Sequence, residues 1–357
     1  MPGWRPEADR DRIRVTSVTA TPSPAPLAPA DRALVTRVRA GERRALAKAI
    51  TLIESTRRDH RVRGQAVLEA LLPHAVNSIR IGISGAPGVG KSTFIESLGL
   101  HLIGRDHRVA VLAVDPSSSV TGGSILADKT RMEELSRSPR AFIRPSPAGA
   151  SLGGVAARTR EALAVCEAAG FDVIIVETVG VGQSETAVAR MTDLMVLLQL
   201  PNAGDELQAL KKGIVELADI LVVNKADLDP DRAAQAEHML KSTLAILRSS
   251  SPNWRPPVLA LSALTGDGIA GFWSEVERYR STMQASGEFD ARRRSQAQAW
   301  MWQVIDERLR EDFRGHPEVA AQLPGMLAAV TAGTLTPAMA AEQLLALARA
   351  MKAHGSP

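Results

Sequence analysis

Short runs of aliphatic and β-branched residues recur along the middle of the chain, separated by stretches with helical patterning. Each run is almost continuously apolar, which is typical of strands that are buried on both faces. Such strands alternating with helices predict an α/β fold, with a mostly parallel sheet covered by helices on both faces. The predicted strands are Ile79–Ser84, Val109–Val114, Val173–Val176, Leu194–Leu200, Ile220–Val223 and Val258–Leu261.

A helical pattern precedes this region, from residue 31 to residue 72. Leu46, Ile50 and Ile53 share one helical face, and Arg and Lys occupy the other. The pattern is broken near Gly41 and near Asp59, and a proline ends it. We expect a helical arm that packs beside the α/β domain.

The strand signals stop after about residue 285. Trp302, Ile305 and Leu309 then form an apolar helical stripe. Thr336 and Pro337 are a good cap and first-turn pair for a last helix. These features predict a helical C-terminal extension, for which dimerisation is one use.

Four parts follow from these patterns. The first residues are rich in Pro and poor in large hydrophobic side chains, so we expect disorder there. The predicted parts are a disordered tail (1–30), an N-terminal helical arm (31–75), the α/β domain (76–284) and a C-terminal helical dimerisation extension (285–357).

Composition excludes several classes of protein. The 43 Lys and Arg are interspersed with 39 Asp and Glu, so the net charge of +4 indicates a solvated surface and no nucleic-acid partner. A single cysteine, Cys166, excludes an intramolecular disulfide and fits a reducing compartment. No apolar run approaches the roughly 20 residues of a membrane span, and no signal core is present. We expect a cytoplasmic protein; a cleaved transit peptide is the alternative, which the acidic residues Glu7, Asp9 and Asp11 weaken.

The strongest chemical signal is a glycine-rich segment that ends in Gly90-Lys91-Ser92. It matches G-x-x-x-x-G-K-[ST], follows a predicted strand and opens a predicted helix, which is the context of a P-loop NTPase. Backbone N–H groups of such a loop converge on phosphate oxygens, and the helix N-terminus favours negative charge. Lys91 would hold the β- and γ-phosphates, and Ser92 would ligate magnesium. The predicted nucleotide-binding residues of this segment are Gly85, Pro87, Gly88, Val89, Gly90, Lys91, Ser92 and Thr93.

A second segment indicates the base. Asn224, Lys225 and Asp227 follow a predicted strand and fit the N-K-x-D guanine signature. A carboxylate at Asp227 can accept hydrogen bonds from the N1–H and the exocyclic amine of guanine, whereas adenine would leave it unpaired. Ser262-Ala263 follows the next strand and supports the same interpretation. We therefore predict GTP and GDP as ligands, and ATP as the minor alternative.

A third segment, Glu177-Thr178-Val179-Gly180, directly follows the strand Val173–Val176. Glu177 can reach magnesium directly or through water, and the N–H of Gly180 can approach the γ-phosphate. GTPases usually have Asp at the first of these positions. Val181 stands where Ras-like enzymes have the water-orienting Gln, so we predict slow intrinsic hydrolysis.

Two further aspartates have open roles. Asp115 follows the strand Val109–Val114, and Asp128 lies in a polar stretch beyond it. Either could bind magnesium or orient the attacking water. Equally, Asp115 could begin an ordinary Asp-Pro turn and Asp128 could cap a helix.

Several of these blocks resemble the MeaB/ArgK/MMAA family of P-loop GTPases, over about residues 31 to 350. Glu177 belongs to the shared pattern, so its departure from Ras-like enzymes is the rule in that family. One block differs, because the family's usual Pro-Gly-Ala-Gly-Asp reads Pro201-Asn202-Ala203-Gly204-Asp205 here. The blocks are Gly85–Thr93, Val114–Ser118, Thr121–Thr130, Phe142–Ser146, Leu152–Ala156, Val176–Glu185 and Gly204–Gln208.

The resemblance implies a function. It implies a homodimeric, magnesium-dependent GTPase that acts as a chaperone of an adenosylcobalamin-dependent acyl-CoA mutase such as methylmalonyl-CoA mutase. The adenosylcobalamin belongs to that mutase, and the adenosyltransferase that supplies it is a further implied partner. The implied magnesium-site residues are Asp115, Asp128 and Glu177, beside Ser92. The implied switch segment runs from Asn202 to Lys211, with Asp205, Gln208 and Lys211 linking the nucleotide to the partner.

Three other functions compete with this one. A metallochaperone GTPase for nickel-enzyme assembly would need soft or imidazole ligands, but the chain has one Cys and scattered His. A kinase acting on a transport protein would need an acceptor site, and the guanine signature argues against ATP. A GTP-binding scaffold without hydrolysis is disfavoured by intact Lys91 and Ser92.

Overall fold

The computed structural model describes residues 27–55, 57–114, 132–145, 152–178, 184–201, 212–246 and 251–350. The predicted disordered tail lies outside these residues except at its end. The first helix, α1 (Pro29–Arg39), begins two residues earlier than predicted. A proline fits the first turn of a helix, where its missing N–H has no partner to lose.

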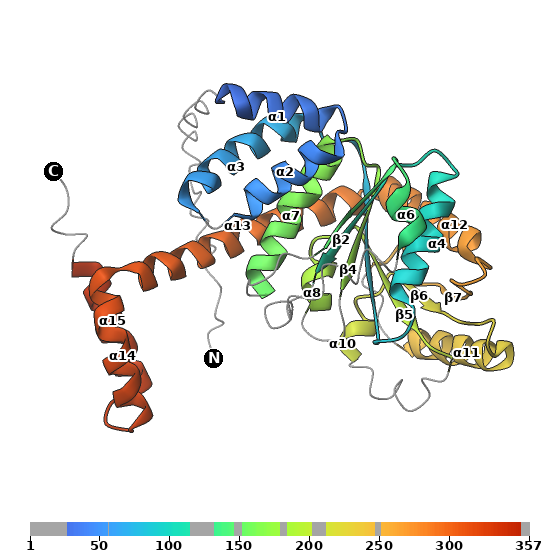
Figure 1. Cartoon of the computed structure of the whole chain (residues 1–357). Coiled ribbons are helices and arrows are strands. Elements are labelled where there is room, and N and C mark those ends of the chain that lie inside the picture. The colour runs from blue at the N-terminus through green and yellow to red at the C-terminus, as the bar shows by residue number, and fades with distance from the viewer. Residues whose placement is uncertain are drawn as a thin grey trace, which may run out of the picture.

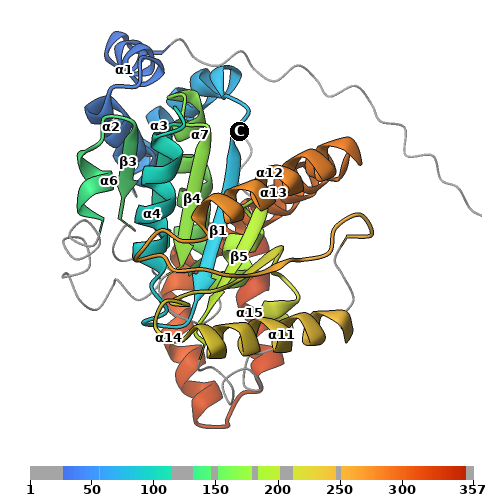
Figure 2. The ribbon, with the colours of Figure 1, turned by 90° about the vertical axis from the view of Figure 1, so that its right-hand side faces the viewer.

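The centre of the molecule is a seven-stranded sheet in the order β3-β2-β4-β1-β5-β6-β7, and every neighbouring pair is parallel. This confirms the predicted α/β P-loop architecture. Figure 2 shows β4, β1 and β5 side by side at the middle of the sheet. The strands are β1 (Ile79–Gly85), β2 (Val109–Val114), β3 (Ala141–Arg144), β4 (Val173–Thr178), β5 (Leu194–Gln199), β6 (Ile220–Val223) and β7 (Val258–Ala260).

Both faces of the sheet are covered by helices, as the continuous apolar strands predict. Along β5, Met195 and Leu197 face one layer, and Val196 and Leu198 face the other. The first layer contains α7 (Leu152–Ala168), α8 (Ser184–Ala189), α10 (Lys212–Val215) and α11 (Pro230–Ile246). The second contains α4 (Lys91–Ile103), α6 (Glu133–Arg137) and α12 (Ile269–Ala285).

The N-terminal arm consists of α1, α2 (Arg43–Glu54) and α3 (Arg58–Leu71), followed by the 3-10 turn η1 (Leu72–His74). These helices pack on α7 (Figure 1). The break predicted at Gly41 is present, with φ of 75°. The break predicted near Asp59 is also present, between Glu54 and Arg58, and Asp59 lies in the first turn of α3, where a carboxylate interacts favourably with the helix dipole.

Glu161 of α7 is a half-buried carboxyl group under this arm. Gln65 of α3 donates a hydrogen bond to it at 2.9 Å. Burial raises the pKa of Glu161 to about 7, because the opposing effects of Gln65, Arg158 and Arg308 are smaller. The raised pKa means that the folded protein holds a proton that an unfolded chain has already released above about pH 4.5. Stability therefore falls as the pH rises from about 4.5 to 7.

We expect Glu161→Gln to remove this penalty, because a neutral amide can still accept the hydrogen bond from Gln65. The variant should be more stable than the wild type by about 1–2 kcal/mol at pH 8, and by much less at pH 5. Urea unfolding at the two pH values measures the difference. Glu69→Gln, at an exposed position of α3, is the matched control. An equal effect of Glu161→Gln at both pH values would contradict the assignment.

The C-terminal extension consists of α13 (Glu288–Gly315), α14 (Pro317–Thr331) and α15 (Pro337–Ala350). In Figure 1 the second half of α13 continues away from the sheet to α14 and α15, which pack against each other. Thr336 caps α15 as predicted, since its Oγ1 accepts a hydrogen bond from the Met339 N–H at 3.3 Å. Among the described helices, none is long and apolar enough to cross a membrane.

Candidate nucleotide-binding site

The glycine-rich loop joins β1, the central strand, to the N-terminus of α4. It therefore opens at the carboxyl edge of the sheet, where ligands bind in open parallel α/β folds. Gly90, the residue before α4, has φ of 92°, in the left-handed region. A Cβ at this position would lie 2.8 Å from Nδ2 of Asn224. Both the backbone conformation and the close approach of Asn224 thus require glycine here.

Lys91 is the first residue of α4, and its side chain curls back over the loop. Its Nζ donates hydrogen bonds to the carbonyl oxygens of Gly85 at 2.8 Å and Ala86 at 3.2 Å. The ammonium group is thereby held above the loop, beside the partly positive helix N-terminus. The arrangement suits an anionic ligand such as a nucleotide phosphate.

The next residue, Ser92, lies beside the end of β4. Its Oγ is 3.4 Å from Oε1 of Glu177, whose side chain is almost fully buried. Hydroxyl and carboxylate oxygens are ligands that Mg²⁺ prefers, so Ser92 and Glu177 would hold that ion. When bound, the ion would neutralise negative charge on the phosphate groups. No cluster of three or more His, Cys, Asp or Glu suited to a metal occurs among the residues described.

A contact between β4 and β1 was not anticipated from the sequence. Thr178 donates from Oγ1 to Oγ of Ser84 at 3.0 Å, and both side chains are fully buried. This bond joins the carboxyl ends of β4 and β1 beside the loop. The sequence gives no sign of this contact, because Ser84 and Thr178 are common residue types that belong to no shared motif.

Asn224 joins two loops of the site. Its buried side chain donates from Nδ2 to the Val89 carbonyl oxygen at 2.8 Å, and its Oδ1 accepts from the Ala263 N–H at 3.0 Å. One amide thus fixes the P-loop and the Ser262-Ala263 segment relative to each other. In the sequence, Asn224 is a candidate only for the base-binding signature.

The residues after Asn224 place a carboxylate at the surface of the site. Lys225 has φ of 63°, rare for a residue with a side chain, which turns the backbone sharply after β6. Asp227, two residues later, is exposed. Ser262 is buried and accepts the Thr265 N–H at its Oγ, at 3.2 Å, which holds its segment in a compact turn.

The structure therefore brings most of the predicted nucleotide residues to one edge of the sheet. Glu177 lies at the carboxyl end of β4, and the P-loop, the Asn224–Asp227 segment and Ser262-Ala263 follow the carboxyl ends of β1, β6 and β7. Six predicted residues lie outside the described part of the chain: Asp115, Asp128, Gly180, Asp205, Gln208 and Lys211.

Comparison with known families agrees with this geometry. The model of the family described as "Methylmalonyl Co-A mutase-associated GTPase MeaB" matches residues 46–318. The chain belongs to the MeaB family of GTPases. It is therefore a GTP-binding P-loop protein that hydrolyses GTP, as the P-loop and the guanine signature predict.

Individual relatives of this MeaB-family chain span most of its length. The mouse protein named "Methylmalonic aciduria type A homolog, mitochondrial" is 47% identical over 325 residues, which cover 87% of this chain and 78% of the mouse protein. The Escherichia coli "GTPase ArgK" is 45% identical over 311 residues, covering 87% and 94%. A solved structure titled "Crystal structure of LAO/AO transport system kinase" has a TM-score of 0.72 and 38% identity, and covers 91% of this chain and 100% of that one.

Proposed function

We propose that this GTPase is a chaperone of an adenosylcobalamin-dependent acyl-CoA mutase, gating cofactor loading and protecting or reactivating the mutase. The observation that carries the proposal is the match of residues 46–318 to a family described as mutase-associated. The name of the mouse relative refers to methylmalonic aciduria, which favours methylmalonyl-CoA mutase as the partner. The adenosyltransferase that supplies the cofactor is proposed as a second partner.

Magnesium and a partner-dependent catalytic step complete the proposed mechanism. Ser92 and Glu177 would hold magnesium, with Asp115 and Asp128 contributing carboxylates. The position after Gly180 is Val181, so the chain lacks the glutamine that orients water in Ras-like GTPases. Slow intrinsic hydrolysis suits a timed switch. The partner would accelerate hydrolysis by repositioning the segment that contains Gln208 and Lys211.

The C-terminal extension is proposed to form a homodimer. Trp302 and Leu309 of α13 are 61% and 60% exposed, and Leu327 of α14 is 58% exposed. Large exposed apolar side chains gathered on one extension are typical of an interaction surface. A second copy of the chain is the proposed occupant, and size-exclusion chromatography with light scattering would measure it.

The test of the chaperone proposal is GTP hydrolysis by the purified chain with and without methylmalonyl-CoA mutase. We expect slow, magnesium-dependent turnover of GTP that the mutase raises by about tenfold or more, and negligible turnover of ATP. Lys211→Ala should keep the basal rate and lose the stimulation, if that residue acts as proposed.

Two outcomes separate the parts of this proposal. Turnover that no adenosylcobalamin-dependent acyl-CoA mutase changes would overturn the chaperone role and leave the GTPase activity standing. Full stimulation of Lys211→Ala would remove only the assigned role of that lysine. Ala203→Gly, a neighbouring change in the same segment, controls for general disturbance.

A further inference from the structure

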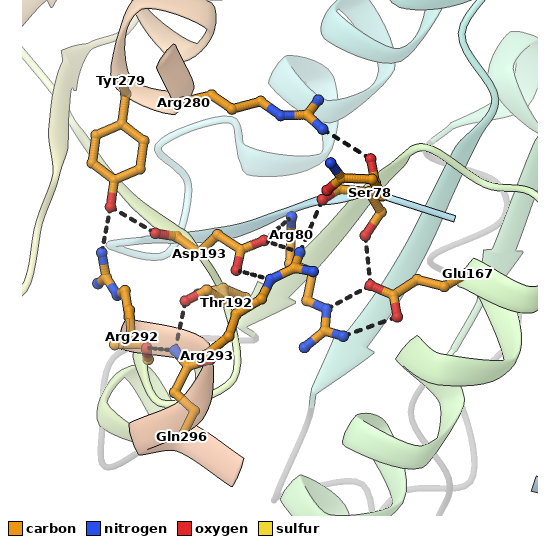
Figure 3. Close-up of polar contacts among 12 residues, drawn as sticks. Ser78, Arg80, Glu167, Thr192, Asp193, Tyr279, Arg280, Arg292, Arg293 and Gln296 are labelled. Atoms are coloured by element: carbon orange, nitrogen blue, oxygen red, sulfur yellow. Dashed lines mark hydrogen bonds and ion pairs between the residues drawn. The ribbon is translucent and has the colours of Figure 1, made fainter. Parts of the chain in front are cut away.

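The start of α13 lies against the amino edge of the sheet, opposite the nucleotide-binding edge. Figure 3 shows two consecutive arginines of this helix: Arg293 reaches the carboxylate of Asp193, and Arg292 reaches the hydroxyl of Tyr279. Arg293 pairs with Asp193 through hydrogen bonds of 2.7 and 2.6 Å, and Arg292 pairs with Asp219 at 3.0 and 3.2 Å. Asp193 and Asp219 immediately precede β5 and β6.

Arg293 also reaches the central strand. It donates to the Ser78 carbonyl oxygen at 2.9 Å, and Ser78 immediately precedes β1. The pair of arginines therefore ties α13 to the starts of three strands that end at the nucleotide-binding edge. Each of the two carboxylates is almost fully buried and has its charge matched, so this part of α13 is a fixed anchor.

The next turn of α13 makes a different contact. Gln296 donates from Nε2 to the carbonyl oxygens of Thr192 at 2.8 Å and Ala189 at 3.4 Å (Figure 3). These two residues end α8 and follow it. Arg160 of α7 donates to the carbonyl oxygen of Arg190, between them, at 2.8 Å. The carbonyl groups at the end of a helix have no partner within it, so side chains from α13 and α7 satisfy them.

α8 also packs directly against β1, the strand that leads into the P-loop. A Cβ at Gly82 of β1 would lie 2.8 Å from Cγ1 of Val188 and 2.8 Å from Oγ1 of Thr192. The absence of a side chain at Gly82 thus lets α8 rest on β1 three residues before the P-loop begins. α8 itself starts six residues after Thr178, whose neighbour Glu177 faces Ser92. The end of one short helix, with the residues that follow it, therefore contacts both the P-loop strand and α13.

Hydrogen bonding at this junction is incomplete within the described structure, unlike at the arginine anchor. Buried atoms without a partner are Oε1 of Gln296, Nε and Nη1 of Arg160 and Nε1 of Trp300. The guanidinium group of Arg160 lies 5.9 Å from the ring centre of Trp300, a residue of α13. Burial lowers the pKa of Arg160 to about 10. Unsatisfied buried groups are costly and few in native proteins. Because several buried polar groups at this junction have no hydrogen bond to lose, the junction can rearrange with a small loss of free energy.

We propose that Gln296, Arg160 and Trp300 form a latch through which the position of α8 sets the position of α13. GTP and GDP would favour different positions of α8, since α8 follows the strand that faces the magnesium site. The latch would transmit this difference to the second half of α13, and so to α14 and α15. A ligand shifts such an equilibrium only as far as it distinguishes the two states, and typical couplings of this kind are about 5- to 150-fold.

This inference goes beyond the chaperone proposal and does not depend on it, because the latch lies within the GTPase itself. Hydrogen exchange of the full chain tests it, with GDP or a non-hydrolysable GTP analogue bound and no mutase present. In the wild type, we expect amide exchange in residues 300–315 to differ by about fivefold or more between the two nucleotides. Gln296→Leu keeps the side-chain volume but removes the donor, and should reduce this difference to less than half.

Matched variants make the outcome decisive. Gln303→Leu changes the same residue type two turns further along α13, where Gln303 donates to Glu307 of the same helix at 3.5 Å. It should keep the nucleotide-dependent difference. Trp300→Phe tests the same junction by a smaller change, in case Gln296→Leu unfolds the protein. No difference in the wild type, or an undiminished difference in a folded Gln296→Leu or Trp300→Phe protein, would overturn the proposal.

Discussion

Lys91→Ala is expected to lower the rate of GTP hydrolysis at saturating GTP by about 10²- to 10³-fold. Lys91 begins α4, and the Gly85 and Ala86 carbonyl oxygens hold its ammonium group over the loop at 2.8 and 3.2 Å. During hydrolysis, negative charge develops on the phosphate oxygens and the leaving group. A positioned ammonium group stabilises that charge without reorganising, so its loss affects the transition state more than the bound substrate.

Single-turnover hydrolysis with a radiolabelled nucleotide measures this effect apart from product release. Lys91→Arg should recover little activity, because a planar guanidinium group cannot make the same contacts as a compact ammonium group. Lys48→Ala, on the exposed side of α2, removes an equal charge at a remote position and should keep the full rate. A Lys91→Ala protein within tenfold of the wild-type rate would show that backbone groups and magnesium carry most of the charge stabilisation.

The central sheet could largely be predicted because its strands are continuously apolar. Val109–Val114 and Ile220–Val223 have the predicted bounds. The edge strand β3 was not predicted, because it has only four residues and ends in Arg144. That arginine pairs with Glu54 of α2, so its place in a strand depends on the packing of the N-terminal arm. Short edge strands carry too little periodicity to be separated from loops.

The nucleotide site also has a part that could be predicted from the sequence and a part that could not. The P-loop and the Asn224–Asp227 segment are contiguous and could be placed from their own residues. The bond from Asn224 to Val89 joins residues 135 positions apart, and that from Thr178 to Ser84 joins residues 94 apart. Such contacts follow from strand order, which no local pattern reveals. They determine how the separate motifs are held as one site.

The anchor of α13 was the least predictable feature. Arg292, Arg293 and Arg294 are consecutive, and their residue type alone does not distinguish one from another. Arg292 and Arg293 pair with buried aspartates, whereas Arg294 is exposed. The distinction depends on the helix face that meets the sheet, and therefore on the whole fold. Removing one of these buried ion pairs gives the largest loss of stability that we expect.

Arg293→Ala is expected to destabilise the protein by about 3–5 kcal/mol. Asp193 has a side chain that is 1% exposed, and Arg293 supplies two of the hydrogen bonds to it. Without the guanidinium group, the carboxylate keeps the N–H of Arg80 at 2.9 Å but loses the ion pair that matches its charge directly. An unpaired buried charge costs far more than the net gain that the pair contributed. The variant also loses the contact of Arg293 with the ring of Phe289, 4.8 Å away.

Denaturant unfolding followed by circular dichroism measures this loss, and Arg294→Ala is the matched control. Arg294 is the same residue type one position further along α13 and is exposed, so its replacement should change stability by less than about 0.5 kcal/mol. Adding Asp193→Asn to Arg293→Ala removes the unpaired charge and should recover part of the loss. Equal effects of Arg293→Ala and Arg294→Ala would contradict the anchor. Recovery of stability in the double variant would show that the loss in Arg293→Ala comes from the unpaired buried carboxylate. Loss of side-chain packing alone would leave the double variant no more stable than Arg293→Ala.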